Sequence, residues 1–164
     1  MPRIQPIHIA SARNRVEPLT LQKAEAFADA VFAEQPNLLG SILVLPRFGV
    51  ALKDLDVALK VLFICHESAR DAAVNLPTIG EEDQERCLAR ISGRAKFLEG
   101  LDSRLSAQAV SDQIQCHPEP YLLAVAYGIL QENNLASVRT EPEKYLLLAV
   151  LNIVETISDA INEA

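Results

Sequence analysis

The chain has 164 residues, of which 49% are hydrophobic, and this is enough to bury one sizeable core. Its formal net charge of −7 argues against general binding to nucleic acid or to anionic lipid, because both require cationic side chains at the surface. Aromatic residues make up only 5%, which leaves little material for a surface that stacks on bases. We therefore expect a globular protein that binds neither nucleic acid nor membrane.

The cysteine content and the apolar runs predict a cytoplasmic location. Three cysteines, an odd number without paired spacing, indicate reduced thiols. The first residues contain Pro2, Arg3 and Pro6 and lack the apolar segment of a signal peptide. The longest uncharged runs, at 120–131 and 145–154, are shorter than the roughly 20 residues that cross a membrane.

Residues 1–18 contain three prolines with isoleucines between them. Proline fixes φ and removes a backbone donor, so this composition predicts an extended N-terminal arm. The arm would either pack on its own domain or be exchanged with a second subunit. The remainder, 19–164, is predicted to form a single all-α helical domain.

Apolar residues recur with helical spacing through that domain and predict a compact all-α bundle of six to seven helices. The predicted helices are Leu21–Gln35, Asn37–Leu45, Leu52–Val74, Glu81–Glu99, Ser103–Gln115, Pro120–Glu132 and Lys144–Ile161. Prolines, glycines and paired asparagines separate them. Gly128, inside the sixth of these segments, predicts a close contact between helices, because glycine otherwise weakens a helix.

The third and the last of these helices are apolar nearly all round, which is typical of helices covered on every side. Thr140 and Glu143 predict a capping box at the start of the last helix, with Pro142 in its first turn. Because a monomer of this size has limited material to cover two such helices, the pattern also predicts a homodimer.

The two buried helices have similar sequences and similar lead-in segments. In both halves of the chain a proline precedes a Leu-Leu helix, and a longer helix follows with VLFICHE (61–67) or VLNIVET (150–156). Two interpretations are open. One is a pair of pseudo-repeated helical hairpins related by a pseudo-twofold axis, and the other is a chance likeness between two apolar hairpins.

Acidic residues gather around the segment 81–102. The sequence EEDQE at 81–85 has the form E-E-x-x-E, and EGLD at 99–102 has the form E-x-x-D. This pair of motifs resembles the metal-binding signature of the MazG-like, all-α nucleoside triphosphate pyrophosphohydrolases. The resemblance implies a Mg²⁺ site, whose ligands would be Glu82, Glu85, Glu99 and Asp102. A helix break near Gly93 would bring the motifs together, whereas an unbroken helix would separate them by about 30 Å.

Two further groups of polar residues are candidates for function. Arg86, Arg90 and Arg94 recur every four residues, which predicts either a salt-bridged exposed face or a docking stripe for an acidic partner or a phosphate. The two buried helices also carry polar residues that would form a cluster in the core if they faced one another. These residues are His66, Glu67, Asn152 and Glu155.

The chain contains none of the common catalytic signatures: no glycine-rich phosphate loop, no G-x-S-x-G and no H-E-x-x-H. The sequence therefore favours a non-enzymatic cytoplasmic protein that acts through protein–protein interaction with an unidentified partner and needs no cofactor. The alternative is the Mg²⁺-dependent pyrophosphohydrolase implied by the acidic motifs.

Overall fold

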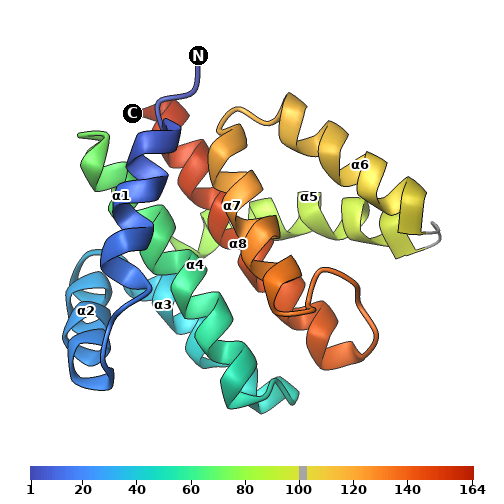
Figure 1. The fold of residues 1–164 in the computed structure, drawn as a ribbon, viewed down its shortest axis with the longest axis horizontal. Coiled ribbons are helices and arrows are strands. Elements are labelled where there is room, and N and C mark those ends of the chain that lie inside the picture. The colour runs from blue at the N-terminus through green and yellow to red at the C-terminus, as the bar shows by residue number, and fades with distance from the viewer. Residues whose placement is uncertain (100–102) are drawn as a thin grey trace.

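The computed structural model describes residues 1–99 and 103–164, together with their side chains except those of 95–99, 103 and 105. The described residues form eight α-helices and one 3-10 helix, and no strand occurs among them (Figure 1). The elements are α1 (Pro6–Val16), α2 (Leu21–Glu34), α3 (Pro36–Leu43), η1 (Leu45–Phe48), α4 (Leu52–Asp71), α5 (Glu81–Glu99), α6 (Ser103–Cys116), α7 (Pro120–Glu132) and α8 (Glu141–Glu163). The predicted compact all-α bundle is confirmed.

Helices α4 and α8 pack against each other at the centre of the bundle (Figure 1). Their middle turns are buried on every side, including polar positions, and this agrees with the apolar runs in the sequence. Helix α8 begins as predicted, because the Thr140 hydroxyl accepts a hydrogen bond from the Glu143 N–H at 3.3 Å. The Glu143 carboxylate accepts from the Arg139 N–H at 2.9 Å instead of from the cap residue itself.

The prediction of an extended N-terminal arm is wrong for residues 6–16, which form helix α1. Pro6 occupies the first turn of this helix, where the missing N–H costs nothing, so the proline starts the helix instead of preventing it. Helix α1 lies along α4 and buries Ala12 and Val16, while Ile4 just ahead of it is fully buried. The N-terminal segment is thus part of the core of its own chain.

The eight described helices divide into two halves, α1–α4 and α5–α8, with the same internal packing. In each half the first helix packs on the fourth, the second on the third, and the third on the fourth. Helices α2 and α6 occupy opposite edges of the molecule (Figure 1). The repeat proposed from the hairpins therefore extends over four helices in each half.

Short matches in sequence accompany this repeat. The segment PRI at 2–4 corresponds to PTI at 77–79, and QPNLL at 35–39 corresponds to EPYLL at 119–123. At the ends of the central helices, ESARDA at 67–72 corresponds to ETISDA at 155–160. Each match occupies the same place in its half, which supports duplication over chance likeness.

The two halves are tied together by reciprocal hydrogen bonds. Gln35, at the start of α3, accepts from the Ile79 N–H at 2.9 Å, just before the second half begins its first helix. Glu119, at the start of α7, accepts from the Ile4 N–H at 3.0 Å, just before the first half begins its first helix. Both side chains are buried. Each half thus positions the leading segment of the other.

The expectation of a close helix contact at Gly128 is wrong, because a Cβ atom placed there would have no neighbouring atom within 4 Å. Within the described part of the chain, α8 alone is long and apolar enough to span a membrane by length and composition. Of its most apolar window, 72% is buried inside the protein. The helix therefore serves here as the core of the bundle.

Candidate functional site

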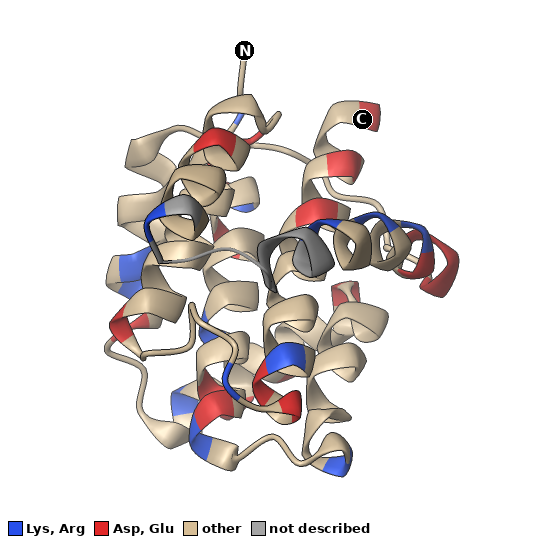
Figure 2. Ribbon diagram, turned by 90° about the vertical axis from the view of Figure 1, so that its right-hand side faces the viewer, with Lys and Arg blue, Asp and Glu red and all other residues tan. Residues whose placement is uncertain are grey.

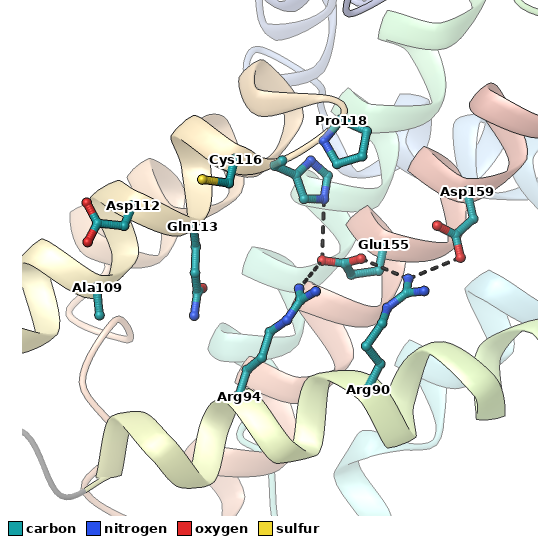
Figure 3. A pocket seen from close by; sticks show the side chains of 10 residues that line it. Arg90, Arg94, Ala109, Asp112, Gln113, Cys116, Pro118, Glu155 and Asp159 are labelled. Carbon is teal, nitrogen blue, oxygen red and sulfur yellow. Dashed lines mark hydrogen bonds and ion pairs between the residues drawn. The ribbon is translucent and has the colours of Figure 1, made fainter.

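A hollow of about 570 Å³ lies between α5, α6 and α8 (Figure 3). Arginines from α5 and carboxylates from α8 form one side of it, and residues at the end of α6 form the other. The lining residues are Arg90, Arg94, Ala109, Asp112, Gln113, Cys116, His117, Pro118, Glu155 and Asp159. This density of ionisable groups makes it the candidate site.

Glu155 is the centre of the charged network in the hollow (Figure 3). Arg94 donates through Nη1 to its Oε1 at 2.8 Å, and His117 Nε2 lies 3.3 Å from the same oxygen. Arg90 donates through Nη2 to Oε2 at 2.9 Å and also to Asp159 Oδ2 at 3.1 Å. The side chain of Glu155 is 8% exposed, so a buried carboxylate holds two arginines whose outer parts reach solvent.

The ion pairs decide the protonation state of Glu155. Burial by itself would raise the pKa of this carboxyl, but His117 and Arg94 outweigh burial and lower the pKa to about 2. Glu155 is therefore ionised throughout the physiological range. A permanently charged carboxylate suits a group that positions arginines, and it is a poor proton acceptor at neutral pH.

The tautomer of His117 follows from its hydrogen bonds. The Glu119 N–H donates to His117 Nδ1 at 3.0 Å, so this nitrogen carries the lone pair. In the neutral ring the proton then sits on Nε2, which faces Glu155. Nδ1 is thus hydrogen-bonded to the backbone, and Nε2 lies 3.3 Å from Oε1 of the central carboxylate.

The structure divides the predicted arginine stripe. Arg90 and Arg94 line the hollow, whereas Arg86 pairs with Asp83 of its own helix at 2.8 Å and lies outside the hollow. Figure 2 shows acidic positions at the start of α5 and basic positions on the turns that follow. The stripe is therefore partly a local ion pair and partly the wall of the site.

The four residues of the predicted core cluster are all buried, but they belong to two separate networks. On α8, Glu155 faces the hollow and the Asn152 amide donates to the Gln84 carbonyl at 2.8 Å. On α4, His66 and Glu67 contact residues of the first half instead. The α4 and α8 polar groups point outward from the central pair and do not meet.

The α4 network has the same composition as the network in the hollow. Arg15 donates to Glu67 Oε2 at 3.0 Å and to Asp71 at 2.9 Å, as Arg90 does to Glu155 and Asp159. Arg70 Nη1 lies 3.2 Å from Glu67 Oε1, and His66 Nδ1 lies 3.6 Å from that oxygen. In each half, one buried glutamate is thus flanked by two arginines and a histidine.

The acidic motifs do not come together through the helix break that the resemblance required. Helix α5 continues through Gly93 to Glu99, so Glu82 and Glu85 lie roughly 21–26 Å along the axis from Glu99. Asp102 lies outside the described residues. Within residues 1–99 and 103–164, no group of three or more His, Cys, Asp or Glu is placed to hold a metal ion.

The three thiols are free and differ in environment. Burial raises the pKa of Cys65 to about 12. Burial, together with a hydrogen bond to Asp159, raises the pKa of Cys87 to about 12. Cys116 is exposed and lines the hollow. Cys116 is therefore the accessible thiol of the chain.

Sequence reasoning missed His117 and Arg15. His117 follows α6 and reaches Glu155 across 38 positions of sequence, so no local spacing connects the two. Arg15 was assigned to an extended arm. For Arg15 the available signal was the likeness of PRI at 2–4 to PTI at 77–79, because the same register aligns Arg15 with Arg90.

Comparison with models of protein families, with curated proteins and with solved structures found no match to this chain.

Proposed function

We propose that this chain is a non-enzymatic cytoplasmic protein that acts by binding a partner protein, and that the hollow between α5, α6 and α8 is its docking site. The observation that carries the proposal is a solvent-accessible hollow of about 570 Å³ lined by charged groups that are already held in position. The three free thiols favour the reducing cytoplasm.

The protonation states favour binding over catalysis. A general acid or base works best with a pKa near the operating pH, whereas the pKa of Glu155 is about 2. A cysteine nucleophile requires a thiolate, whereas the pKa of the Cys87 thiol beside the hollow is about 12. Glu155 therefore holds a fixed negative charge and Cys87 stays a neutral thiol, and neither exchanges a proton near neutral pH.

The arginines remain available to a partner. The side chains of Arg90 and Arg94 are 39% and 45% exposed, although each is anchored to the buried Glu155. Anchoring lowers the conformational entropy that a partner must remove on binding. Arginine is also enriched at the residues that dominate the binding energy of protein interfaces.

Site-specific cross-linking in cells tests this proposal. A photoreactive amino acid replaces Ala109 in the hollow or, as a control, the exposed Lys23 on α2. We expect a discrete cross-linked species from position 109 alone, and its loss when Arg94→Gln is added. Identical products from both positions, or products that persist with Arg94→Gln, would overturn the docking site.

A further inference from the structure

We infer that the hollow recognises a carboxylate, supplied by an acidic side chain of the partner, and that Arg94 is the residue that binds it. This inference rests on the proposed docking function and adds the chemistry of the contact. Its basis is the network around Glu67 in the first half of the chain, which has the same composition as the network in the hollow and binds a second carboxylate within the same molecule.

In the first half, a second carboxylate binds to the network around Glu67. Glu34, at the end of α2, accepts from Arg70 Nη2 at 3.1 Å through Oε1. Its Oε2 lies 2.9 Å from His66 Nε2. Arg70 thus bridges two carboxylates: the buried Glu67 on one side and the half-exposed Glu34 on the other.

In the second half, Arg94 on α5 makes the contact to the buried glutamate that Arg70 on α4 makes in the first, although the repeat itself aligns Arg70 with Ser158. Among the described side chains, no second carboxylate pairs with Arg94. Both arginines contact the Oε1 atom of their buried glutamate, and the histidine of each half lies against that same atom. Helix α6, which corresponds to α2, ends at Cys116. Among the described side chains, Glu155 is the carboxylate that pairs with Arg94. The hollow leaves the exposed part of Arg94 open to a second carboxylate.

The guanidinium of Arg94 is suited to a second carboxylate. It has five N–H donors in one plane, and Nη1 is directed at Glu155. The group is 45% exposed toward the hollow, so its remaining edge can meet a planar carboxylate in a forked arrangement. Arg90 is already shared between Glu155 and Asp159. These contacts select Arg94 over Arg90.

Asp112 also faces the hollow, and its removal should change carboxylate binding in the opposite direction to removal of Arg94. It lines the far side of the hollow, where it accepts from Gln108 Nε2 at 2.9 Å and points away from Arg94 (Figure 3). Its negative charge repels an anion that enters the hollow. Removal of this charge should therefore strengthen carboxylate binding, whereas removal of Arg94 should weaken it.

Disulfide exchange at Cys116 of the full chain measures how strongly the hollow prefers a carboxylate to an uncharged group of the same size. The exposed Cys116 reacts, whereas Cys65 and Cys87 are buried thiols. The probes are disulfides that leave a carboxylate, a carboxamide or a sulfonate on Cys116 through two to four methylene groups. Mass spectrometry of the intact protein at thiol–disulfide equilibrium gives the ratio of carboxylate adduct to the size-matched carboxamide adduct.

We expect Arg94→Gln to lower this ratio by about three- to fivefold, as for loss of a partly exposed ion pair. Arg86→Gln is the matched control, because it removes the same charge from the same helix outside the hollow, and it should leave the ratio unchanged. Asp112→Asn should raise the ratio, and this variant removes no contact to the core.

An equal ratio in the unmodified protein and in Arg94→Gln would overturn the inference, and so would an Asp112→Asn variant with no increase. A sulfonate adduct favoured as strongly as the carboxylate would also overturn it, because the hollow would then be a general oxyanion site. Failure of the carboxylate inference can be distinguished from failure of the docking proposal. The cross-linking experiment shows whether any partner binds in the hollow, whatever its chemistry.

Discussion

At the scale of single residues, Glu155 shows how a charge is kept inside the bundle. An unpaired carboxylate at this depth would be neutralised by proton uptake, because burial disfavours the ionised form. His117 and Arg94 reverse that preference. The second half of the chain therefore depends on an ion pair whose strength varies with pH.

The pKa of Glu155 predicts a loss of stability in acid. The folded pKa is about 2, whereas the ordinary value is 4.5. Because the folded pKa is depressed, the stabilisation is present above pH 4.5 and is lost as the pH falls toward 2. We expect this residue to contribute about 3 kcal/mol to that loss, measured by urea unfolding at successive pH values. Glu155→Gln should flatten this part of the profile, and an unchanged slope would contradict the assignment.

Two glycines predict stability changes of opposite sign. Gly128 lies inside α7 with free space around its Cβ position, so Gly128→Ala should raise the free energy of unfolding by about 0.5–1 kcal/mol.

Gly49 has a φ of 88°, and a Cβ there would lie 3.2 Å from Pro142 Cγ. Gly49→Ala should lower that free energy by about 1–2 kcal/mol. Urea unfolding of both variants checks the signs, and a destabilised Gly128→Ala would indicate an unrecognised contact.

At the scale of elements, the segments that lead into α1 and α5 are held from the opposite half. Glu119 binds the backbone N–H groups of Arg3 and Ile4, and Gln35 binds that of Ile79. Buried donors of this kind must be paired, so each contact determines where a first helix can start. This arrangement explains why the N-terminal segment is ordered as a helix against α4.

The correspondence between Gln35 and Glu119 predicts which substitutions are tolerated. Glu119→Gln retains an oxygen acceptor, as Gln35 has in the other half, whereas Glu119→Ala leaves the buried Ile4 N–H and the part-buried Arg3 N–H unpaired. The alanine variant should lose about 1–3 kcal/mol, and the glutamine variant should lose less. Amide hydrogen exchange at Ile4 provides a local measurement, with faster exchange expected in Glu119→Ala. Equal exchange in both variants would show that the carboxylate does not hold this segment.

At the scale of the whole molecule, duplication organises the core and the arginine, glutamate and aspartate that each charged network shares. The central helices α4 and α8 are covered within one chain, by α1 and α3 on one side and by α5 and α7 on the other. The limited cover that suggested a homodimer is thus supplied by the repeat itself. A second copy would have to use another surface, and three exposed apolar side chains follow one another along the chain from the end of α3 to the start of α4. These are Leu43, Phe48 and Leu52.

The homodimer is still a prediction, and light scattering at micromolar concentration tests it. A dimer would have twice the 18.0 kDa mass of the chain. If Leu43, Phe48 and Leu52 form the interface, Leu52→Lys should convert the dimer to a monomer. Leu21→Lys on α2 should leave the dimer intact, although Leu21 is as highly exposed as Leu52. A monomeric mass for the unmodified chain would contradict the prediction.

Seven of the eight described helices were determined by the sequence alone, whereas α1 was expected to be an extended arm. Apolar periodicity, the Thr140 cap and prolines at first-turn positions act over a few residues, so seven helices and the two central ones were predictable. The candidate site was decided by tertiary structure. The orientation of α4 and α8 about their own axes decides which neighbours their side chains face, so His66 and Glu155 face different helices. The turn after α6 then brings His117 to Glu155. Local periodicity identifies the buried positions of a helix but not the helix that lies opposite, because the choice of neighbour depends on packing over the whole chain.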